Sequence, residues 1–335
     1  MFYVDDGTKV IECSIKMRRV KPTIKIGRLI AKGSKTMEIT PTFHAPNFSI
    51  NWLSTALREE IHCFNAHKFA FTLRSEIEQN RMTITFLGTG TSQGVPVITC
   101  DCAICTSADP RDQRLRSSVM VTSKGKNVII DTGPDFRQQM LREKVKAIDA
   151  IVFTHEHKDH IAGLDEVRAF NYFNKWRAQV FCTDLVEEAL RREFAYAFTD
   201  MKYPGIPEID IHRIDSTQFD LIGLTFQPIA VTHFEMPVFG YRIGDFTYIT
   251  DANHISDEEK SKIRGSKVLV LNALRKAKHP SHFNLEQAIA LSRQLEAETT
   301  YFTHISHQLG IHETIEKELP PGIHLAYDGL KINID

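Results

Sequence analysis

Short apolar segments that end in polar residues recur along the chain from Met82 onward, and this pattern predicts buried strands. Such segments cover residues 83–87, 128–130, 150–153, 224–231, 246–249, 267–271 and 301–303. Longer intervening segments predict helices over 159–173, 183–198 and 285–295, and in the last of these the apolar residues lie largely on one face. Because strands alternate with helices, the sequence predicts an α/β or α+β fold with layered sheets.

The first 81 residues lack this regularity. They are net basic, whereas residues 82–335 are net acidic, and their periodicity is weak. We therefore place a domain boundary at 81/82, and we expect residues 1–81 to be a poorly ordered N-terminal extension and 82–335 to be one domain. A related expectation is that translation starts at Met82, so that the extension lies outside the native product. Peptides from before Met82 in a mass spectrum of the native protein would exclude this second expectation.

Composition and charge narrow the class of protein. The chain has 335 residues, of which 42% are hydrophobic and 25% charged, as in ordinary soluble globular proteins. A net charge of −1 argues against a general nucleic-acid or membrane-surface binder. No apolar run approaches the roughly 18 residues that span a bilayer, and no apolar signal segment follows the start. Three of the six cysteines lie within six residues, which favours metal ligation in a reducing, cytoplasmic compartment over disulfides.

The strongest chemical signal is the segment His-Glu-His-Lys-Asp-His at 155–160, which follows one predicted strand and opens a predicted helix. Neutral imidazole and carboxylate are good ligands for Zn²⁺, Mn²⁺ or Fe²⁺. On such a turn His155 and His157 can point one way while Asp159 and His160 point another, so the segment could serve two metal ions. The alternative is a histidine-rich polar turn at the surface.

This segment resembles the signature of the metallo-β-lactamase superfamily. The resemblance covers residues 82–335, and it implies an αββα sandwich with a one- or two-metal site at the edge of the two sheets. It implies three further ligands, each at the end of a predicted strand: His233, Asp251 and His304. Asp131 matches an aspartate that in the family orients a metal-bound histidine, although an apolar strand ending in Asp-Thr-Gly also fits a plain turn.

With this ligand set the resemblance implies a dinuclear site, whose two Zn²⁺ or Mn²⁺ ions would supply a hydroxide nucleophile for hydrolysis. Asp159 would also help to hold that hydroxide. One metal would be bound by His155, His157 and His233, and the other by Asp159, His160 and His304, with Asp251 as the bridge.

The cysteine cluster predicts a second metal site. Cys100, Cys102 and Cys105 need a fourth ligand to complete a tetrahedral structural zinc, and His307 could supply it; the alternative is free thiols in a loop. The cluster follows Gly-Thr-Gly-Thr-Ser-Gln-Gly at 88–94. Together the two motifs resemble the phosphoribosyl cyclic phosphodiesterase branch of the superfamily, whose members have a Cys3His structural zinc. The glycine spacing does not fit a dinucleotide-binding fingerprint.

One more histidine has a candidate role. His282 precedes the amphipathic helix at 285–295 and resembles a residue that this branch places over the substrate phosphate. It would contact the phosphate or act as general acid for the leaving oxygen. A surface histidine flanking the helix is the alternative, and His279 is the second choice for the role.

The sequence therefore predicts a metal-dependent hydrolase, specifically a phosphodiesterase for a small, in one version cyclic, phosphodiester. A tRNA 3′-end processing endonuclease is an alternative, but we find no long Gly- and Lys-rich arm and no basic catalytic region. A thioesterase or lactonase would use the same metals at carbon. A non-enzymatic metal scaffold is disfavoured because the whole ligand set is present. We expect no membrane partner and no nucleic-acid partner, and a homodimer is common among such enzymes.

Overall fold

The computed structural model describes residues 10–15, 24–32, 36–39, 82–199 and 204–334. The chain divides into two compact units, Met1–Leu73 and Arg74–Asp335. In the first unit the described residues form an antiparallel sheet of three strands, which the sequence did not predict: β1 (Val10–Ile15), β2 (Ile24–Lys32) and β3 (Thr36–Ile39). The rest of the expected extension lies outside the described residues, and its order stays a prediction.

Among the described residues of the second unit the first strand begins at Met82, and the unit contains two seven-stranded sheets. The domain boundary at 81/82 stays a prediction. In the first sheet β17, β4, β5 and β6 pair antiparallel, and β6 to β9 pair parallel. Its strands in spatial order are β17 (Lys331–Ile334), β4 (Met82–Gly88), β5 (Ser118–Ser123), β6 (Lys126–Ile130), β7 (Ala150–Val152), β8 (Ala178–Cys182) and β9 (Ile209–Arg213).

The second sheet has the same mixed character. Its strands β10 to β13 pair antiparallel and β13 to β16 pair parallel. In spatial order they are β10 (Phe219–Leu221), β11 (Leu224–His233), β12 (Met236–Ile243), β13 (Phe246–Tyr248), β14 (Val268–Asn272), β15 (Thr299–Thr303) and β16 (Ile323–Leu325).

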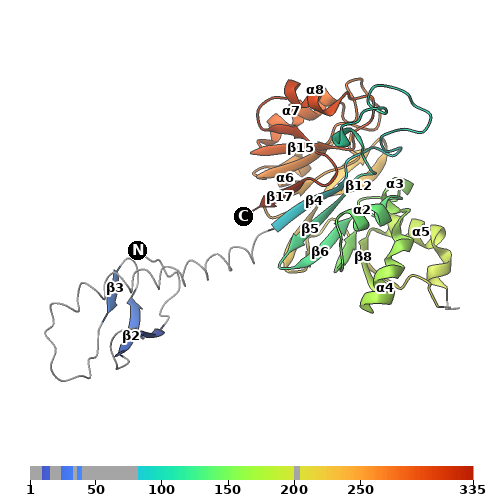
Figure 1. Cartoon of the computed structure of the whole chain (residues 1–335). Helices are drawn as coiled ribbons and strands as arrows, with labels where there is room; N and C mark the ends of the chain where they lie inside the picture. Colours follow the sequence, from blue (N-terminus) through green and yellow to red (C-terminus); the bar gives the residue numbers. More distant parts are fainter. Residues whose placement is uncertain (1–9, 16–23, 33–35, 40–81, 200–203, 335) are drawn as a thin grey trace, which may run out of the picture. The chain divides into compact units, whose positions relative to one another are not determined.

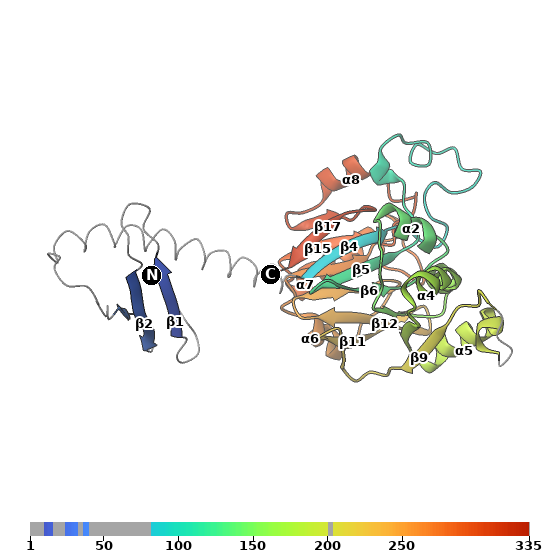
Figure 2. The same ribbon diagram turned by 60° about the horizontal axis from the view of Figure 1, so that its bottom comes forward.

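Helices cover the outer face of each sheet, which confirms the predicted αββα sandwich (Figures 1 and 2). On the first sheet lie α2 (Phe136–Arg142), α3 (Lys158–Ile161), α4 (Arg168–Asn174) and α5 (Asp184–Glu193), with 3-10 turns at Leu164–Val167 and Ala195–Phe198. On the second lie α6 (Asp257–Ile263), α7 (Leu285–Leu295) and α8 (His312–Glu318). Another 3-10 turn, Pro110–Asp112, lies in the loop between β4 and β5.

Three apolar clusters hold these layers together. The central one joins the facing sides of the two sheets through residues such as Phe86, Tyr241 and Tyr248, all buried. The outer two pack each sheet against its helices. Among the described residues, none of the helices is long and apolar enough to cross a bilayer.

The predicted helices at 159–173 and 183–198 are each interrupted. The first is split into α3, a 3-10 turn and α4, and the second ends at Glu193 before another 3-10 turn. The first helix is interrupted at Gly163, where the chain passes close to Gly133. A Cβ at position 163 would lie 2.1 Å from the carbonyl oxygen of Gly133. The helix at 285–295 is confirmed, and its first turn is fixed by a capping box between Asn284 and Gln287.

Candidate metal centres

The predicted ligands of the dinuclear site come together where strands of both sheets end. Asp251 and His304 follow the carboxyl ends of the parallel strands β13 and β15, and His233 ends β11. The remaining ligands lie on the turn from β7 into α3: His155, His157, Asp159 and His160. Carboxyl ends of parallel strands meet at one edge of a sheet, and the candidate ligands named above therefore lie close together.

Asp251 lies at the centre of this cluster and is 1% exposed. Its Oδ1 lies 3.0 Å from His304 Nδ1 and 3.4 Å from His160 Nε2, and its Oδ2 lies 3.8 Å from His155 Nε2. Three groups of candidate ligands share it: one formed with His155 and His157, one with Asp159, His160 and His304, and one with His233 and His282. This arrangement is the one expected if Asp251 bridges two metal ions, and that role stays a prediction.

The imidazole nitrogens that face Asp251 fit a metal site. His155 Nε2, His160 Nε2 and His304 Nδ1 are buried, and although each lies within 4 Å of an Asp251 oxygen, none forms a hydrogen bond of acceptable geometry. Unpartnered buried nitrogens are costly, and coordination of a divalent ion would use each lone pair. The donor set of nitrogen and carboxylate oxygen suits Zn²⁺ and Mn²⁺ alike.

The second ring nitrogen of His160, His233 and His304 contacts residues outside the predicted ligand set. The Asp131 carboxylate accepts from His160 Nδ1 at 2.7 Å, and the Ser281 carbonyl accepts from His233 Nδ1 at 2.7 Å. The Thr91 hydroxyl lies 3.1 Å from His304 Nε2. Since a neutral imidazole has one N–H, bonding at one nitrogen leaves the other with a lone pair for a metal.

Asp131 is itself held firmly. It is fully buried and accepts from the backbone N–H and the hydroxyl of Thr154, both at 2.8 Å, as well as from His160. The loop that carries it approaches α3 closely at Gly133, where a Cβ would lie 2.2 Å from the Asp159 carbonyl oxygen. The structure therefore gives Asp131 the contacts of a residue that orients His160, as expected from the resemblance.

Backbone strain marks the same strand ends. Asp131, Asp251 and His304 all adopt positive φ, at 65°, 53° and 55°. Non-glycine residues in this region cost on the order of 1 kcal/mol or more, and they concentrate at functional sites. Here the left-handed residue ends each strand abruptly, within the cluster of candidate ligands.

His282 lies in the same cluster, on the segment before α7. Its ring is 4.5 Å from that of His233 and 4.8 Å from that of His304, and its Nδ1 is buried without a hydrogen-bond partner. It forms a further possible ligand group with His233 and Asp251. His279, the second choice, is 5.2 Å away between ring centres and contacts Ser281 instead.

Electrostatics within the cluster favour a bound cation. Burial lowers the pKa of His155 and of His233, and it lowers the pKa of His282 to about 2, so these rings are neutral. Burial also lowers the pKa of His160, but the neighbouring carboxylates, that of Asp251 foremost, outweigh it and hold this pKa well above the ordinary value. The carboxylates thus stabilise positive charge at this point.

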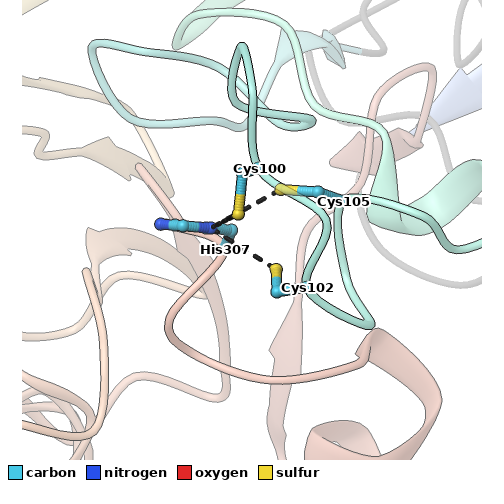
Figure 3. A group of neighbouring side chains, drawn as sticks. All are labelled: Cys100, Cys102, Cys105 and His307. Atoms are coloured by element: carbon cyan, nitrogen blue, oxygen red, sulfur yellow. Dashed lines mark hydrogen bonds between the residues drawn. The ribbon is translucent and has the colours of Figure 1, made fainter.

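The predicted structural zinc site is also assembled (Figure 3). The loop after β4 brings the sulfur atoms of Cys100, Cys102 and Cys105 to 3.3, 3.5 and 3.5 Å from His307 Nδ1. A tetrahedral zinc with Zn–S of ~2.3 Å and Zn–N of ~2.0 Å separates sulfur from nitrogen by about 3.5 Å. Hydrogen bonding, first from the Cys105 backbone, lowers the pKa of Cys102 to about 6, which favours a thiolate.

Sequence reasoning did not identify Thr91, Thr154 and Ser281, which contact the candidate ligands from outside. Thr154 directly precedes His155, and its hydroxyl lies 2.9 Å from His155 Nδ1. Thr91 lies in the glycine-rich segment that carried part of the resemblance, so both threonines had a positional signal. Ser281 contributes a backbone carbonyl, which no residue type reveals.

Comparison with known proteins agrees with the fold. Residues 126–305 match the family described as "Beta-lactamase superfamily domain". A curated octanoyltransferase of Porphyromonas gingivalis is 37% identical over 257 residues, which are 76% of this chain and 52% of that protein. The chain therefore spans about half the length of this relative.

Two solved structures resemble it over most of the second unit. The crystal structure of a new diphosphatase from the PhnP family is 46% identical, with a TM-score of 0.71, and covers 76% of this chain and 97% of the other. Zinc-bound PqqB from Methylobacterium extorquens shares the fold at 19% identity, with a TM-score of 0.62, and covers 75% of this chain and 100% of that one.

The family match extends over more than half of the chain, and its limits enclose most of the strand ends that carry the candidate ligands. The layered sheets and the similarity to the PhnP-family diphosphatase agree with it. The chain therefore belongs to the metallo-β-lactamase superfamily.

Proposed function

We propose that this protein is a phosphodiesterase that hydrolyses a small phosphodiester at a dinuclear metal site. The observation that carries the proposal is the set of three ligand groups that share buried Asp251, one of which contains His282. The 46% identity to a diphosphatase supports chemistry at phosphorus, because the name of that relative denotes an enzyme that acts on a phosphate compound.

The residues of the site would have two kinds of role, binding the metal ions and orienting the ligand rings. His155 and His157 would bind one ion with His233, whose ring lies 5.9 and 5.1 Å from theirs between centres. Asp159, His160 and His304 would bind the other ion, and Asp251 belongs to both sets. Two divalent ions at such a site supply an acidified water and neutralise the phosphoryl oxygens. Asp131, Thr91 and the Ser281 carbonyl would keep the ligand rings oriented.

His282 would contact the substrate phosphate. It is 8% exposed and lies between His233 and His304, next to but outside the two groups that share Asp251 in the proposed assignment. A positioned imidazole of this kind contributes about 100-fold or more to proton transfer or charge stabilisation. Because burial keeps this ring neutral, it would aid departure of the leaving oxygen by donating a hydrogen bond from its N–H.

The Cys3His cluster would have a structural role. It would tie the loop after β4 to the segment that follows β15, since His307 lies three residues beyond His304. A zinc ion there would fix one wall of the active site while leaving the chemistry to the other cluster.

Hydrolysis at an acyl carbon is the second candidate. It is favoured by the 37% identity to an octanoyltransferase, an enzyme whose name refers to acyl chemistry. However, the match covers 52% of that relative, so the name of the whole relative is weak evidence for the activity of the matched part. This leaves the phosphodiesterase proposal better supported.

A substrate panel tests the proposal. Full-length protein loaded with Zn²⁺ or Mn²⁺ would be assayed with bis-p-nitrophenyl phosphate, an acyl thioester, a β-lactam and a precursor tRNA. We expect turnover of the phosphodiester, its loss on chelation, and recovery on adding metal. Faster turnover of the thioester would favour the second candidate, and cleavage of the precursor tRNA at its 3′ end would favour the endonuclease.

Variants of His282 test its assigned role. H282A should lower kcat for bis-p-nitrophenyl phosphate by about 100-fold or more with unchanged metal content, while H254A, at an exposed histidine, should leave both unchanged. Loss of metal in H282A would instead place this residue among the ligands.

A further inference from the structure

An exposed aromatic residue lies directly beside the proposed dinuclear site. Phe234 follows His233 in the chain, and its side chain is 58% exposed. It contributes to none of the three apolar clusters among the described residues. Burial of apolar surface therefore gives no reason for a phenylalanine at this position.

The backbone gives a reason against it. His233 pairs with Met236, so Phe234 and Glu235 form a two-residue hairpin loop between β11 and β12. Phe234 has φ of +57° at the first position of that loop. Glycine is strongly preferred where such a turn requires positive φ, and a bulky residue there is strained. The chain thus keeps an aromatic side chain in a conformation that disfavours it, without a packing benefit.

Hydrogen bonds fix this residue relative to the site. The Phe234 N–H donates to Asn253 Oδ1 at 2.8 Å, and Asn253 Nδ2 donates to the Pro280 carbonyl at 3.0 Å. Asn253 comes two residues after Asp251, and Pro280 comes two residues before His282. The loop is thereby joined to two of the other segments that carry residues of the site, those of Asp251 and His282, so Phe234 is held at its rim.

An exposed aromatic ring at the rim of a phosphodiester site offers a flat apolar surface for one end of a substrate. Stacking of a nucleobase on an aromatic side chain is favourable and tolerates any base, because every base has a π-face. The rings of His233, His282 and His279 also contact one another in series, with centres 4.5 and 5.2 Å apart.

We infer that Phe234 determines specificity by stacking against a planar aromatic group of the substrate, so that the preferred substrates are phosphodiesters that carry a nucleobase. The inference rests on the proposed phosphodiesterase function and adds a substrate class to it. Phe234 contacts the part of the substrate that does not react, and its contribution therefore falls on KM more than on kcat.

A matched substrate pair measures this contribution. Adenosine 2′,3′-cyclic phosphate and methyl riboside 2,3-cyclic phosphate differ in the base alone. For the metal-loaded full chain, F234A should raise KM for the adenosine compound about 10-fold. It should change KM for the methyl riboside compound less than 2-fold. F234W should restore the preference. F173A, at an even more exposed aromatic on α4 with 79% exposure, should change neither KM value.

Two controls separate substrate contact from a structural role. F234A and F234G should keep the metal content of the wild type, and the melting temperature of F234G should stay within about 2 °C, because glycine relieves the strained φ while adding unfolded-state entropy. A loss of metal or of thermal stability that accounts for the rise in KM would overturn the inference, as would an equal effect on both substrates.

A binding measurement tests the role of Phe234 without depending on turnover. Calorimetric titration of the metal-loaded protein with AMP and with ribose 5-phosphate should show tighter binding of AMP, and F234A should abolish the difference. If the wild type hydrolyses none of the phosphodiesters, the proposed function fails, whereas the binding comparison still decides the role of Phe234. An unchanged preference for AMP in F234A would refute it.

Discussion

Replacing Asp131 with asparagine tests whether the buried carboxylate behind the metal site orients a ligand. In the wild type Asp131 accepts three hydrogen bonds, two from Thr154 and one from His160 Nδ1. Asparagine has the same shape but offers one carbonyl oxygen and one NH₂ group. If its NH₂ faces His160, this ring must move its proton to Nε2, the nitrogen that faces Asp251 at 3.4 Å. If it faces the Thr154 N–H, one buried donor loses its partner.

The magnitude follows from these contacts. Hydrogen bonds to a charged group contribute about 1.5–3 kcal/mol each, and an unpaired buried donor costs about 1–3 kcal/mol. Burial raises the pKa of Asp131, so removal of its charge offsets part of that loss. We therefore expect D131N to lower the free energy of unfolding by about 2–3 kcal/mol, equivalent to about 5–10 °C in melting temperature. Metal affinity should fall by about 10–100-fold, as for other partners of metal-bound histidines.

The assay combines metal analysis with a matched control. Asp328 is a second buried carboxylate, which accepts from the Thr89 hydroxyl, the Leu115 N–H and Arg142, and it contacts no imidazole. D131N and D328N should lose similar thermal stability, while D131N alone should lose metal in elemental analysis and in titrations against a chelator. Unchanged metal affinity in D131N, or an equal loss in D328N, would refute the orienting role.

Three other predictions concern the two metal sites and pH. D251A should bind at least one active-site metal fewer per chain and lose turnover, because three candidate ligand groups share this carboxylate; full activity would contradict a dinuclear site. C102S should contain one zinc fewer and melt at lower temperature while keeping the active-site metals, and an unchanged zinc count would exclude the structural site. Burial and, after it, Arg114 lower the pKa of His312 to about 4, so the folded form binds this proton less readily than the unfolded chain, with its pKa near 6.5. The free energy of unfolding should therefore fall by about 3 kcal/mol as pH drops from about 6.5 to about 4, and H312Q, followed by denaturant titration, should show a smaller fall.

Local pattern was sufficient for the elements that lie nearest the site. The apolar segments at 128–130, 150–153 and 301–303 predicted strands because each is buried on both faces, and the polar residue that ends each one predicted its place at the rim. The helix at 285–295 was predictable because its apolar positions repeat with the helical period and Asn284 caps it.

Elements whose signals depend on their neighbours were missed. Strand β12 contains Pro237, Gly240 and charged Arg242, and its pairing with β11 is what holds it extended. The predicted helix at 159–173 was interrupted because Gly163 packs directly against Gly133 of another loop. In both cases a tertiary contact overrides the local preference.

The sequence by itself determined the chemistry available to this protein. The histidines and aspartate of 155–160 and the cysteines of 100–105 are close in the chain, so their spacing alone indicated two kinds of metal site. The tertiary structure decided how those groups are used. It brings His307 to the cysteines across about two hundred residues, and it selects the nitrogen that each ring turns toward Asp251. It also places strained Phe234 at the rim of the site. The physical reason is that ligand type is a property of a residue, whereas orientation depends on hydrogen bonds from segments that only folding brings together.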